Sequence, residues 1–570
     1  METNSSRSRK TYRHPDHISG ERMRRNFFAL LLTLTLGFSA VAQTIRITPA
    51  ERTMAESITS DQLSSYLYFV ASDAMEGRDT PSRGLDITAE FLKMNLKRWG
   101  FKPAGDNGTF FQKMELTVES IDAVNNVLQV ENKSFNLNTD FYRLRGNGSA
   151  NALMVFAGNG WVVKSKNIDA YKGVDVRGRI VVLMGSGFPN TNTLTSMPAS
   201  VTEADLTGTK GTDWSDPLTY ATNNGAAGVI VIASPDIQSS WGSMRRFLSR
   251  GNTFPTKLNP APPETVSKLP VALVSNAVAN AIFAGASAGK DSPTPFTIDK
   301  TVSMTTMGRT ESKWTQNVVA VWEGSDPVLK NEMVAVGAHY DHVGTNQNAP
   351  GDDKIWNGAD DDGSGTVAVL AIAEALAKSK VRPKRSILLV WHAGEEKGLW
   401  GAEYFNKFPT VDIKNVIAQL NIDMIGRSLD PKNVIKCDSP GKRCNENLTK
   451  ASEIYVIGSE MMSTTLGAIT KATNAAYLKL DYNYKYDDPK DKERFFFRSD
   501  HFHYAMNGIP IAFWFDGVHE DYHQPSDHAD KIDYTKMEKV TRTIFLTMWE
   551  LSDLRDRPKV DKKLPPELTR

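Results

Sequence analysis

The sequence predicts an α/β fold, a three-layer α/β/α sandwich with a mixed, mainly parallel sheet, which carries an inserted β-rich domain. From about residue 315 onward, short apolar runs that suit buried strands alternate with segments of helical periodicity. This alternation is typical of a sheet covered by helices on both faces. Between about residues 145 and 305, short β-branched runs separated by loops predict a compact and mostly β insert.

The first 42 residues predict a secretory signal peptide. Three arginines precede a largely apolar run from Phe27 to Phe38, and the small residues Ala40 and Ala42 suit cleavage after Ala42. The apolar run is short for a bilayer span. We therefore expect an exported protein, periplasmic or secreted, without stable membrane insertion after cleavage.

The charge balance gives no reason to expect a nucleic-acid partner. The 570 residues include 67 basic and 66 acidic side chains. Residues 1–42 hold seven basic and three acidic side chains, so cleavage would leave 60 basic and 63 acidic ones. A formal charge of −3 provides no basic field for nucleic acid.

Only two cysteines occur, Cys437 and Cys444, and a turn-like sequence separates them. In an oxidising compartment they could form a local disulfide, and two free thiols are the alternative. Their spacing fits no zinc ribbon.

Residues 43–144 are predicted to form the N-terminal part of the main domain. Helices are expected near Leu63–Val70 and Leu85–Trp99, with a polar turn at Met75–Arg78 between them. The main domain is expected to continue over residues 306–556, and the charged, proline-containing residues 557–570 are expected to form a flexible tail.

The insert is assigned to residues 145–305, and its strands are expected at Val176–Met184, Ala226–Ile232 and Lys268–Val274. In the main domain the same criteria predict four strands and two helices. The strands are Met333–Ala338, Ser386–His392, Val416–Ile422 and Ile509–Phe515, and the helices are Gly363–Lys378 and Leu399–Phe408.

Acidic and imidazole side chains come after the predicted strands of the main domain. They occur in five short segments: 339–342 (HYDH), 358–365 (GADDDGSG), 394–396 (GEE), 421–424 (NIDM) and 522–527 (YHQPSD). Each segment alone suits a solvated turn, a helix cap or surface charge. Because ligands gather at the carboxyl ends of strands in such sheets, the five together favour a site for two divalent metals.

The residue types suit hydrolytic metal chemistry. Imidazole is a zinc ligand, and carboxylates bind borderline divalent cations and can bridge two of them. Of the adjacent Glu395 and Glu396, one side chain can reach a metal while the other stays free as a general base. Asp341 lies two residues after His339, on the same side of an extended segment, and could orient that imidazole.

One nucleotide-binding motif is absent from the sequence. It contains no phosphate-binding Gly-x-x-x-x-Gly-Lys loop, which counts against a P-loop nucleotide site.

Over about residues 315–550, and in part over 56–118, the chain resembles family twenty-eight (M28) of the metallopeptidases, the co-catalytic zinc aminopeptidases. The resemblance implies the zinc-exopeptidase fold and two Zn²⁺ per chain. The middle aspartate of 360–362 is chosen because the next residues, Asp362-Gly363-Ser364-Gly365, match the family pattern. By resemblance, the metal ligands are His339, Asp361 (bridging), Glu396, Asp423 and His523.

The same resemblance assigns roles to four further residues. Glu395 corresponds to the general base, and Asp341 to the partner that orients the first ligand histidine. Tyr522 resembles the tyrosine that stabilises the oxyanion. Arg498, in the segment Phe497-Arg498-Ser499-Asp500-His501, resembles a family residue near the substrate pocket.

The insert resembles a protease-associated domain through residues 176–181, 225–231 and 269–271. Such domains act as lids or guide substrates, and an inert spacer is the alternative.

The resemblances imply an exported, zinc-dependent aminopeptidase that hydrolyses the N-terminal peptide bond of peptides. A carboxypeptidase, a dipeptidase or a glutaminyl-cyclase-like enzyme on the same fold is the first alternative. A non-catalytic binding protein is the second, and the full set of ligand-type residues counts against it. The sequence predicts neither the preferred N-terminal side chain nor the oligomeric state.

Overall fold

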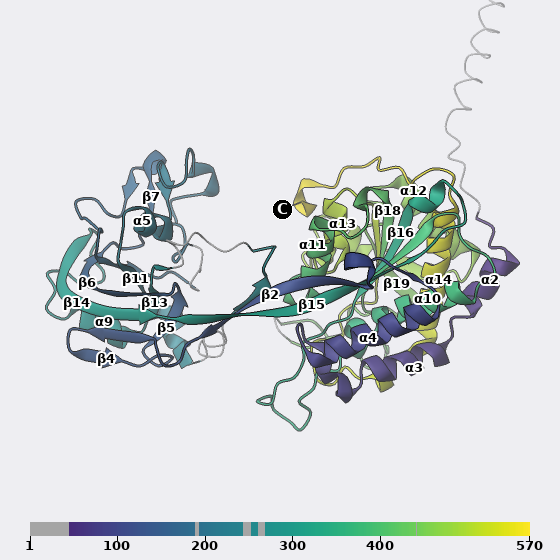
Figure 1. Cartoon of the computed structure of the whole chain (residues 1–570), viewed down its shortest axis with the longest axis horizontal. Coiled ribbons are helices and arrows are strands. Elements are labelled where there is room, and N and C mark those ends of the chain that lie inside the picture. Colours follow the sequence, from purple (N-terminus) through teal and green to yellow (C-terminus); the bar gives the residue numbers. More distant parts are fainter. Residues whose placement is uncertain (1–44, 188–192, 243–251, 260–267, 440–441, 570) are drawn as a thin grey trace, which may run out of the picture.

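The computed structural model describes residues 45–187, 193–242, 252–259, 268–439 and 442–569. The expected signal peptide lies outside these residues. Within the described ranges, every helix is too short or too polar to cross a bilayer. Two large β-sheets, each with its own helices, form two domains that lie side by side (Figure 1).

The main domain is built on a ten-stranded mixed sheet. Along the sheet the strand order is β12-β2-β15-β17-β16-β18-β21-β19-β20, and β1 pairs with β15. The central strands β17, β16, β18 and β21 run parallel. The bounds are β1 Lys102–Pro103, β2 Phe111–Ile121, β12 Asn252–Pro255, β15 Gly308–Trp322, β16 Met333–His339, β17 Ser386–His392, β18 Val416–Ile422, β19 Glu453–Ile457, β20 Asp481–Asn483 and β21 Ile511–Phe515.

Helices cover both faces of this sheet, which confirms the predicted α/β/α fold class. Every residue of β16, β17 and β18 is buried, as continuous apolar runs in a parallel sheet require. Helices α11 (Trp400–Lys407) and α13 (His501–Met506) lie on one face. The other face carries α2 (Pro49–Glu56), α3 (Ser60–Val70), α4 (Arg83–Arg98), α10 (Gly365–Lys378), α12 (Thr464–Ala476) and α14 (Tyr534–Asp553).

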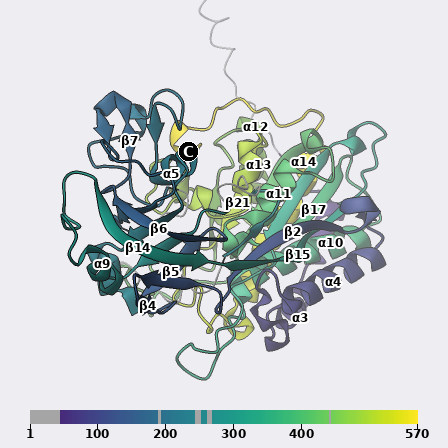
Figure 2. The same ribbon diagram turned by 60° about the vertical axis from the view of Figure 1, so that its left-hand side comes forward.

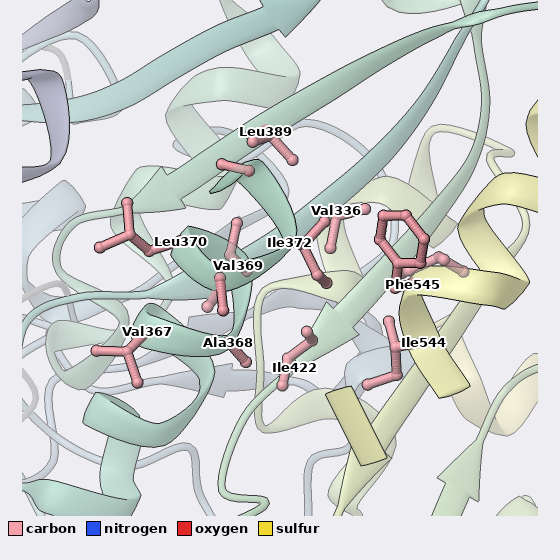
Figure 3. Close-up of a cluster of buried hydrophobic side chains, with 14 of the residues drawn as sticks. Val336, Val367, Ala368, Val369, Leu370, Ile372, Leu389, Ile422, Ile544 and Phe545 are labelled. Atoms are coloured by element: carbon pink, nitrogen blue, oxygen red, sulfur yellow. The ribbon is translucent and has the colours of Figure 1, made fainter. Parts of the chain in front are cut away.

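The larger core lies between the sheet and helices α10 and α14. Val336 of β16 and Leu389 of β17 point toward Ile372 of α10 and Phe545 of α14 (Figure 3). The neighbouring residues Ala335 and Leu388 point to the opposite face and its separate core, because successive side chains of a strand alternate between faces. The two cores hold the parallel strands in place and fix the edge at which they end.

A second, eight-stranded sheet forms the other domain, with the order β4-β3-β14-β6-β9-β11-β13-β5. Its strands are β3 Val127–Val130, β4 Lys133–Phe135, β5 Phe141–Arg145, β6 Gly148–Phe156, β9 Ile180–Met184, β11 Gly228–Ile232, β13 Val271–Val274 and β14 Phe296–Thr306. Helices α5 (Pro217–Asn223), α6 (Pro235–Ser239) and α9 (Asn276–Phe283) accompany it, as does a small sheet of β7 (Val162–Val163), β8 (Ile168–Asp169) and β10 (Trp214–Ser215).

The predicted boundary at residue 145 is therefore wrong, because strands β3, β4 and β5 already belong to the second sheet. These strands are short and partly polar, so their sequences give little sign of their long-range partners. Strand β5, for example, pairs with β13, whose residues lie more than a hundred positions later. The assignment of this domain as protease-associated stays a prediction.

Strands β2 and β15 connect the two domains as one long antiparallel pair (Figures 1 and 2). At the far end of the pair, Ile121 lies opposite Gly308, and the Asp122 amide donates to the carbonyl of Met307 at 3.1 Å. A third segment returns from the second domain, where β12 pairs with β2 and Leu258 packs against Met114 and Leu116. Three chain segments therefore tie the domains together.

The C-terminal residues differ from the predicted flexible tail. The Arg557 side chain donates to a carboxylate oxygen of Glu332 and to the carbonyl of Lys414. Leu568 is 3% exposed and, with Leu564, packs against the smaller core of the main domain. Burial of these two apolar side chains gives the charged segment a fixed path that its composition does not indicate.

Cys437 and Cys444 form a disulfide, with Cα atoms 5.2 Å apart. Of the two alternatives left open by the sequence, the structure therefore has the local disulfide and not two free thiols.

Candidate metal centre

The sequence-predicted ligands lie together at the carboxyl edge of the main sheet. His339 is the last residue of β16, and Asp423 comes directly after β18. Glu396 lies in a short turn after β17, and His523 lies in the loop after β21. Asp361 lies just before α10, where the Asp361–Asp362 peptide bond is cis.

Asp361 joins two groups of ligand atoms. One carboxylate oxygen, Oδ1, lies 3.3 Å from Nε2 of His339, and that nitrogen lies 3.6 Å from Oδ1 of Asp423. The other oxygen, Oδ2, lies 3.0 Å from Nε2 of His523, which is also 3.0 Å from Oε2 of Glu396. The structure thus places all five predicted ligands around two adjacent centres that share one carboxylate.

These side chains fit two zinc ions. Oδ2 of Asp361 and Oε1 of Glu396 are buried without a hydrogen-bond partner, although imidazole nitrogens lie close to both carboxylates. Nitrogen and oxygen donors that converge without hydrogen bonding are what a bound cation requires, and imidazole with carboxylate suits zinc. Buried carboxylates would otherwise carry an uncompensated charge, which is costly.

The pKa values of the two imidazoles indicate that the buried carboxylates create a negative electrostatic field at this site. Burial lowers the pKa of His339, but the charges of Glu395 and Asp423 outweigh it and leave this pKa well above its usual range. Burial also opposes protonation of His523, yet contacts with Asp361 and Glu396 raise its pKa to about 10. Both shifts reflect the negative charge of the surrounding carboxylates, which a bound cation would neutralise.

The two neighbours of Asp361 face away from this centre. Oδ1 of Asp360 accepts the Gly426 amide at 2.7 Å, and its Oδ2 lies 3.2 Å from Nε2 of His519. Oδ1 of Asp362 accepts the amides of Gly365 and Met424. Of the three consecutive aspartates, Asp361 is the one in contact with both His339 and His523.

Glu395 lies beside the centre. Its Oε2 is 3.9 Å from Nε2 of His339, and 13% of its side chain remains exposed. Burial raises the pKa of Glu395 well above its usual range; the charge of His339 opposes this shift, and that of Glu396 adds to it. A partly exposed carboxylate with a raised pKa suits proton transfer at a cavity.

Asp341 contacts Glu395 as well as His339. Its Oδ1 accepts the backbone amide of Glu395 at 3.1 Å, and its Oδ2 accepts the Thr80 hydroxyl at 3.1 Å. Nδ1 of His339 lies 3.6 Å from that Oδ1 and 3.2 Å from the backbone carbonyl of Asp341, which makes the hydrogen bond. The Asp341 backbone thus orients the histidine, while the carboxylate holds the Glu395 turn.

Comparison with known proteins agrees with this geometry. Residues 317–548, from within β15 to within α14, match the model of peptidase family M28. The chain carries an M28 peptidase domain.

Curated relatives of this M28 domain include a probable zinc metalloprotease of Leptosphaeria maculans, 28% identical over 43% of this chain and 58% of that protein. A probable leucine aminopeptidase of Arthroderma benhamiae is 29% identical over 40% of this chain and 56% of its own length. The chain thus spans little more than half of either relative. Among solved structures, an aminopeptidase from Aneurinibacillus sp. strain AM-1 aligns over 90% of this chain and 98% of its own, with 15% identity and a TM-score of 0.47.

A cavity of the M28 domain is lined in part by the candidate metal ligands Asp361 and Asp423. Tyr522 lies at its edge, with its ring stacked on that of His523 at a centroid distance of 3.9 Å. Arg498 lies over the ring of Phe495. The full lining is Asp361, Glu395, Asp423, Met424, Phe495, Arg498, Phe513, Phe515, Val518 and Tyr522. Acidic and apolar side chains therefore both line the cavity.

Sequence reasoning missed the role of Arg78, which lies in the segment expected to be a polar turn. Arg78 is fully buried. Its guanidinium donates to the carbonyls of Tyr340 and Gly358, beside the segments that carry His339 and Asp361, and to those of Val70 and Asn357. No local sequence pattern indicates these hydrogen bonds, because three of the four acceptor residues lie more than 250 positions further along the chain.

Proposed function

We propose that this protein is an exported, zinc-dependent aminopeptidase that hydrolyses the N-terminal peptide bond of peptides. The observation that carries the proposal is the pair of ligand groups sharing Asp361, beside a partly exposed Glu395 that faces the same cavity. An M28 domain with this arrangement has the parts that metal-assisted amide hydrolysis requires.

His339, Asp361 and Asp423 would hold one zinc ion, and Asp361, Glu396 and His523 would hold the other. When bound, the zinc pair supplies Lewis acidity and lowers the pKa of water. Glu395 would accept a proton from the attacking water and deliver it to the leaving amine. The Tyr522 hydroxyl would donate a hydrogen bond to the oxygen on which negative charge develops.

The lining of the cavity favours an N-terminal residue. The carboxylates of Glu395 and Asp423 offer a negative field for a free α-ammonium group. Phe495, Phe513 and Phe515 offer an apolar wall for the side chain of that residue. The similarity to a probable leucine aminopeptidase agrees with an apolar preference.

Export is supported by two independent features. The N-terminal sequence has the pattern of a signal peptide, and Cys437 and Cys444 form a disulfide, which is common in oxidising compartments. The second domain is proposed to act as a protease-associated domain that guides longer substrates.

Hydrolysis of a panel of aminoacyl chromogenic amides, each beside its N-acetylated form, tests the activity. We expect cleavage of the free-amine forms alone, with activity lost on chelation and restored by two Zn²⁺ per chain. Failure of a zinc-loaded, folded protein to cleave any free-amine substrate would contradict the proposal. Binding of a single zinc with cyclisation of N-terminal glutamine would favour the glutaminyl-cyclase alternative.

A further inference from the structure

A second buried imidazole lies beside the metal centre and has no part in the proposed mechanism. His342 lies three residues after His339 and is fully buried. Its backbone amide donates to the carbonyl of Arg78 at 3.1 Å, which fixes the loop after β16. Neither ring nitrogen has a hydrogen-bond partner. A buried imidazole with two unpartnered nitrogens is costly unless something else binds it.

The ring lies against the Glu396 side of the centre. Nδ1 of His342 is 2.8 Å from Oε1 of Glu396 and 3.7 Å from Oδ2 of Asp361. These three residues can offer ligand atoms that all lie within 4.8 Å of one another. The Nδ1–Oε1 contact is short but does not meet the geometry of a hydrogen bond, which is compatible with two ligand atoms that bind one cation.

His342 and His523 approach Glu396 from different sides. His523 is 3.0 Å from Oε2 of Glu396, whereas His342 contacts Oε1. The two imidazole rings are 5.7 Å apart and roughly perpendicular, at 69°. One carboxylate is thus flanked by two imidazoles whose nitrogens point toward the same region, beside the oxygen of Asp361 that His523 also contacts.

The backbone leaves a space for the His342 ring. Gly358 has a φ of +57°, and a Cβ atom there would lie 2.5 Å from both Cγ and Cδ2 of the imidazole. A side chain at position 358 would therefore both strain the backbone and displace the ring. The glycine and the histidine occur in separate segments, which meet to form this slot.

We propose that His342 is a further protein ligand, through Nδ1, of the metal held by Asp361, Glu396 and His523. This inference rests on the proposed two-metal centre. It gives that metal two imidazoles and two carboxylates, whereas the metal at His339 has one imidazole and two carboxylates. Because imidazole suits zinc, copper and nickel, we expect the Glu396 side to retain such metals more strongly than the His339 side.

The test is titration of the metal-free full-length protein with Co²⁺, followed by visible absorption and by competition with a chelator. Wild type is compared with His342→Gln, His342→Cys and the control His528→Gln. His528 is a partly exposed imidazole that pairs with Asp353 and belongs to neither ligand group. We expect the wild type and the control to bind two Co²⁺, and His342→Gln to weaken one of the two sites at least ~10-fold.

His342→Cys separates a ligand from a residue that only orients Glu396. If position 342 contacts the metal, this variant gains a thiolate-to-cobalt charge-transfer band, which the His528→Gln protein lacks. Absence of that band overturns the proposal, even if His342→Gln weakens binding, because the effect would then act through Glu396. Unchanged affinities in a folded His342→Gln protein also overturn it. Fewer than two Co²⁺ in wild type would instead contradict the proposed function.

Discussion

The two domains use similar sheets but differ in the residues at the ends of the strands. In both, central parallel strands are buried on both faces by apolar residues. In the main domain, β16, β17 and β18 lead into His339, Glu395 and Asp423. In the second domain, β9, β11 and β13 lead into Gly185, Ser234 and Ser275. A parallel sheet thus provides a suitable edge, and the residues placed after its strands determine whether ligand-type side chains gather there.

The largest expected effect comes from a change at the edge of the main sheet. Glu395→Gln should lower kcat about 10²- to 10⁴-fold, because the amide cannot accept a proton, while both zinc ions stay bound. Turnover of an aminoacyl amide and metal content by atomic emission are the measurements. Ser234→Ala, at the end of β11 in the second domain, is the matched control and should leave both values unchanged. Wild-type turnover in Glu395→Gln would contradict the assigned base.

The next largest effect is expected from loss of Arg78, whose side chain holds backbone segments at the carboxyl edge of the main sheet. Arg78→Met should lower the free energy of unfolding by about 3–5 kcal/mol, because four buried carbonyls lose a charged donor. The variant should also bind zinc more weakly, since two of those carbonyls lie beside segments that carry ligands. Urea unfolding and zinc titration test this. Arg98→Met, which removes an exposed arginine of α4, should change neither.

Core substitutions should show whether the two sheets are equivalent as scaffolds. Leu389→Ala in β17 and Leu183→Ala in β9 each remove a fully or nearly fully buried leucine, and each should cost about 2–5 kcal/mol. Only Leu389→Ala is expected to reduce zinc affinity, because β17 leads into the turn that carries Glu395 and Glu396. The free energies come from urea unfolding, and the affinities from competition with a chelator. Equal loss of zinc in both variants would show that the second domain supports the centre.

The smallest effect on the chemistry is expected from removal of the second domain. Ile121 and Gly308 are paired, so residues 122–307, which include the second domain and the edge strand β12, can be replaced by a two-residue Asn-Gly turn that closes β2 and β15 as a hairpin. Zinc content and turnover of small aminoacyl amides should change less than about threefold, because every proposed metal ligand remains. Selectivity between long and short peptides should change if the domain guides substrates. Unchanged selectivity would favour an inert spacer.

Sequence reasoning performed best where the signal was local. The strands Ser386–His392 and Val416–Ile422 coincide with β17 and β18, because continuous apolar runs bounded by polar residues are distinctive. The same runs place the ends of the strands, and hence the ligand-type residues, at a single edge. The residues directly after Asp361 distinguish it from the neighbouring aspartates in the sequence, and in the structure Asp360 and Asp362 accept backbone amides.

Long-range contacts could not be predicted in the same way. Arg78 looked like a turn residue because its partners are backbone carbonyls, which carry no sequence signature. His342 belongs to a motif already noted, but its contact with Glu396 depends on how two loops meet. The early strands of the second sheet were missed because their pairing partners lie far along the chain.

The ribbon formed by β2 and β15 has a mechanical consequence. Its strands have 11 and 15 residues, and β15 alone reaches roughly 50 Å at about 3.4 Å per residue. A hydrogen-bonded ribbon of this kind bends and twists as an elastic beam and lacks the free joint of a glycine-rich linker. Thermal motion of the second domain should therefore be a damped oscillation about one orientation, with the restoring force stored in the twist of two strands.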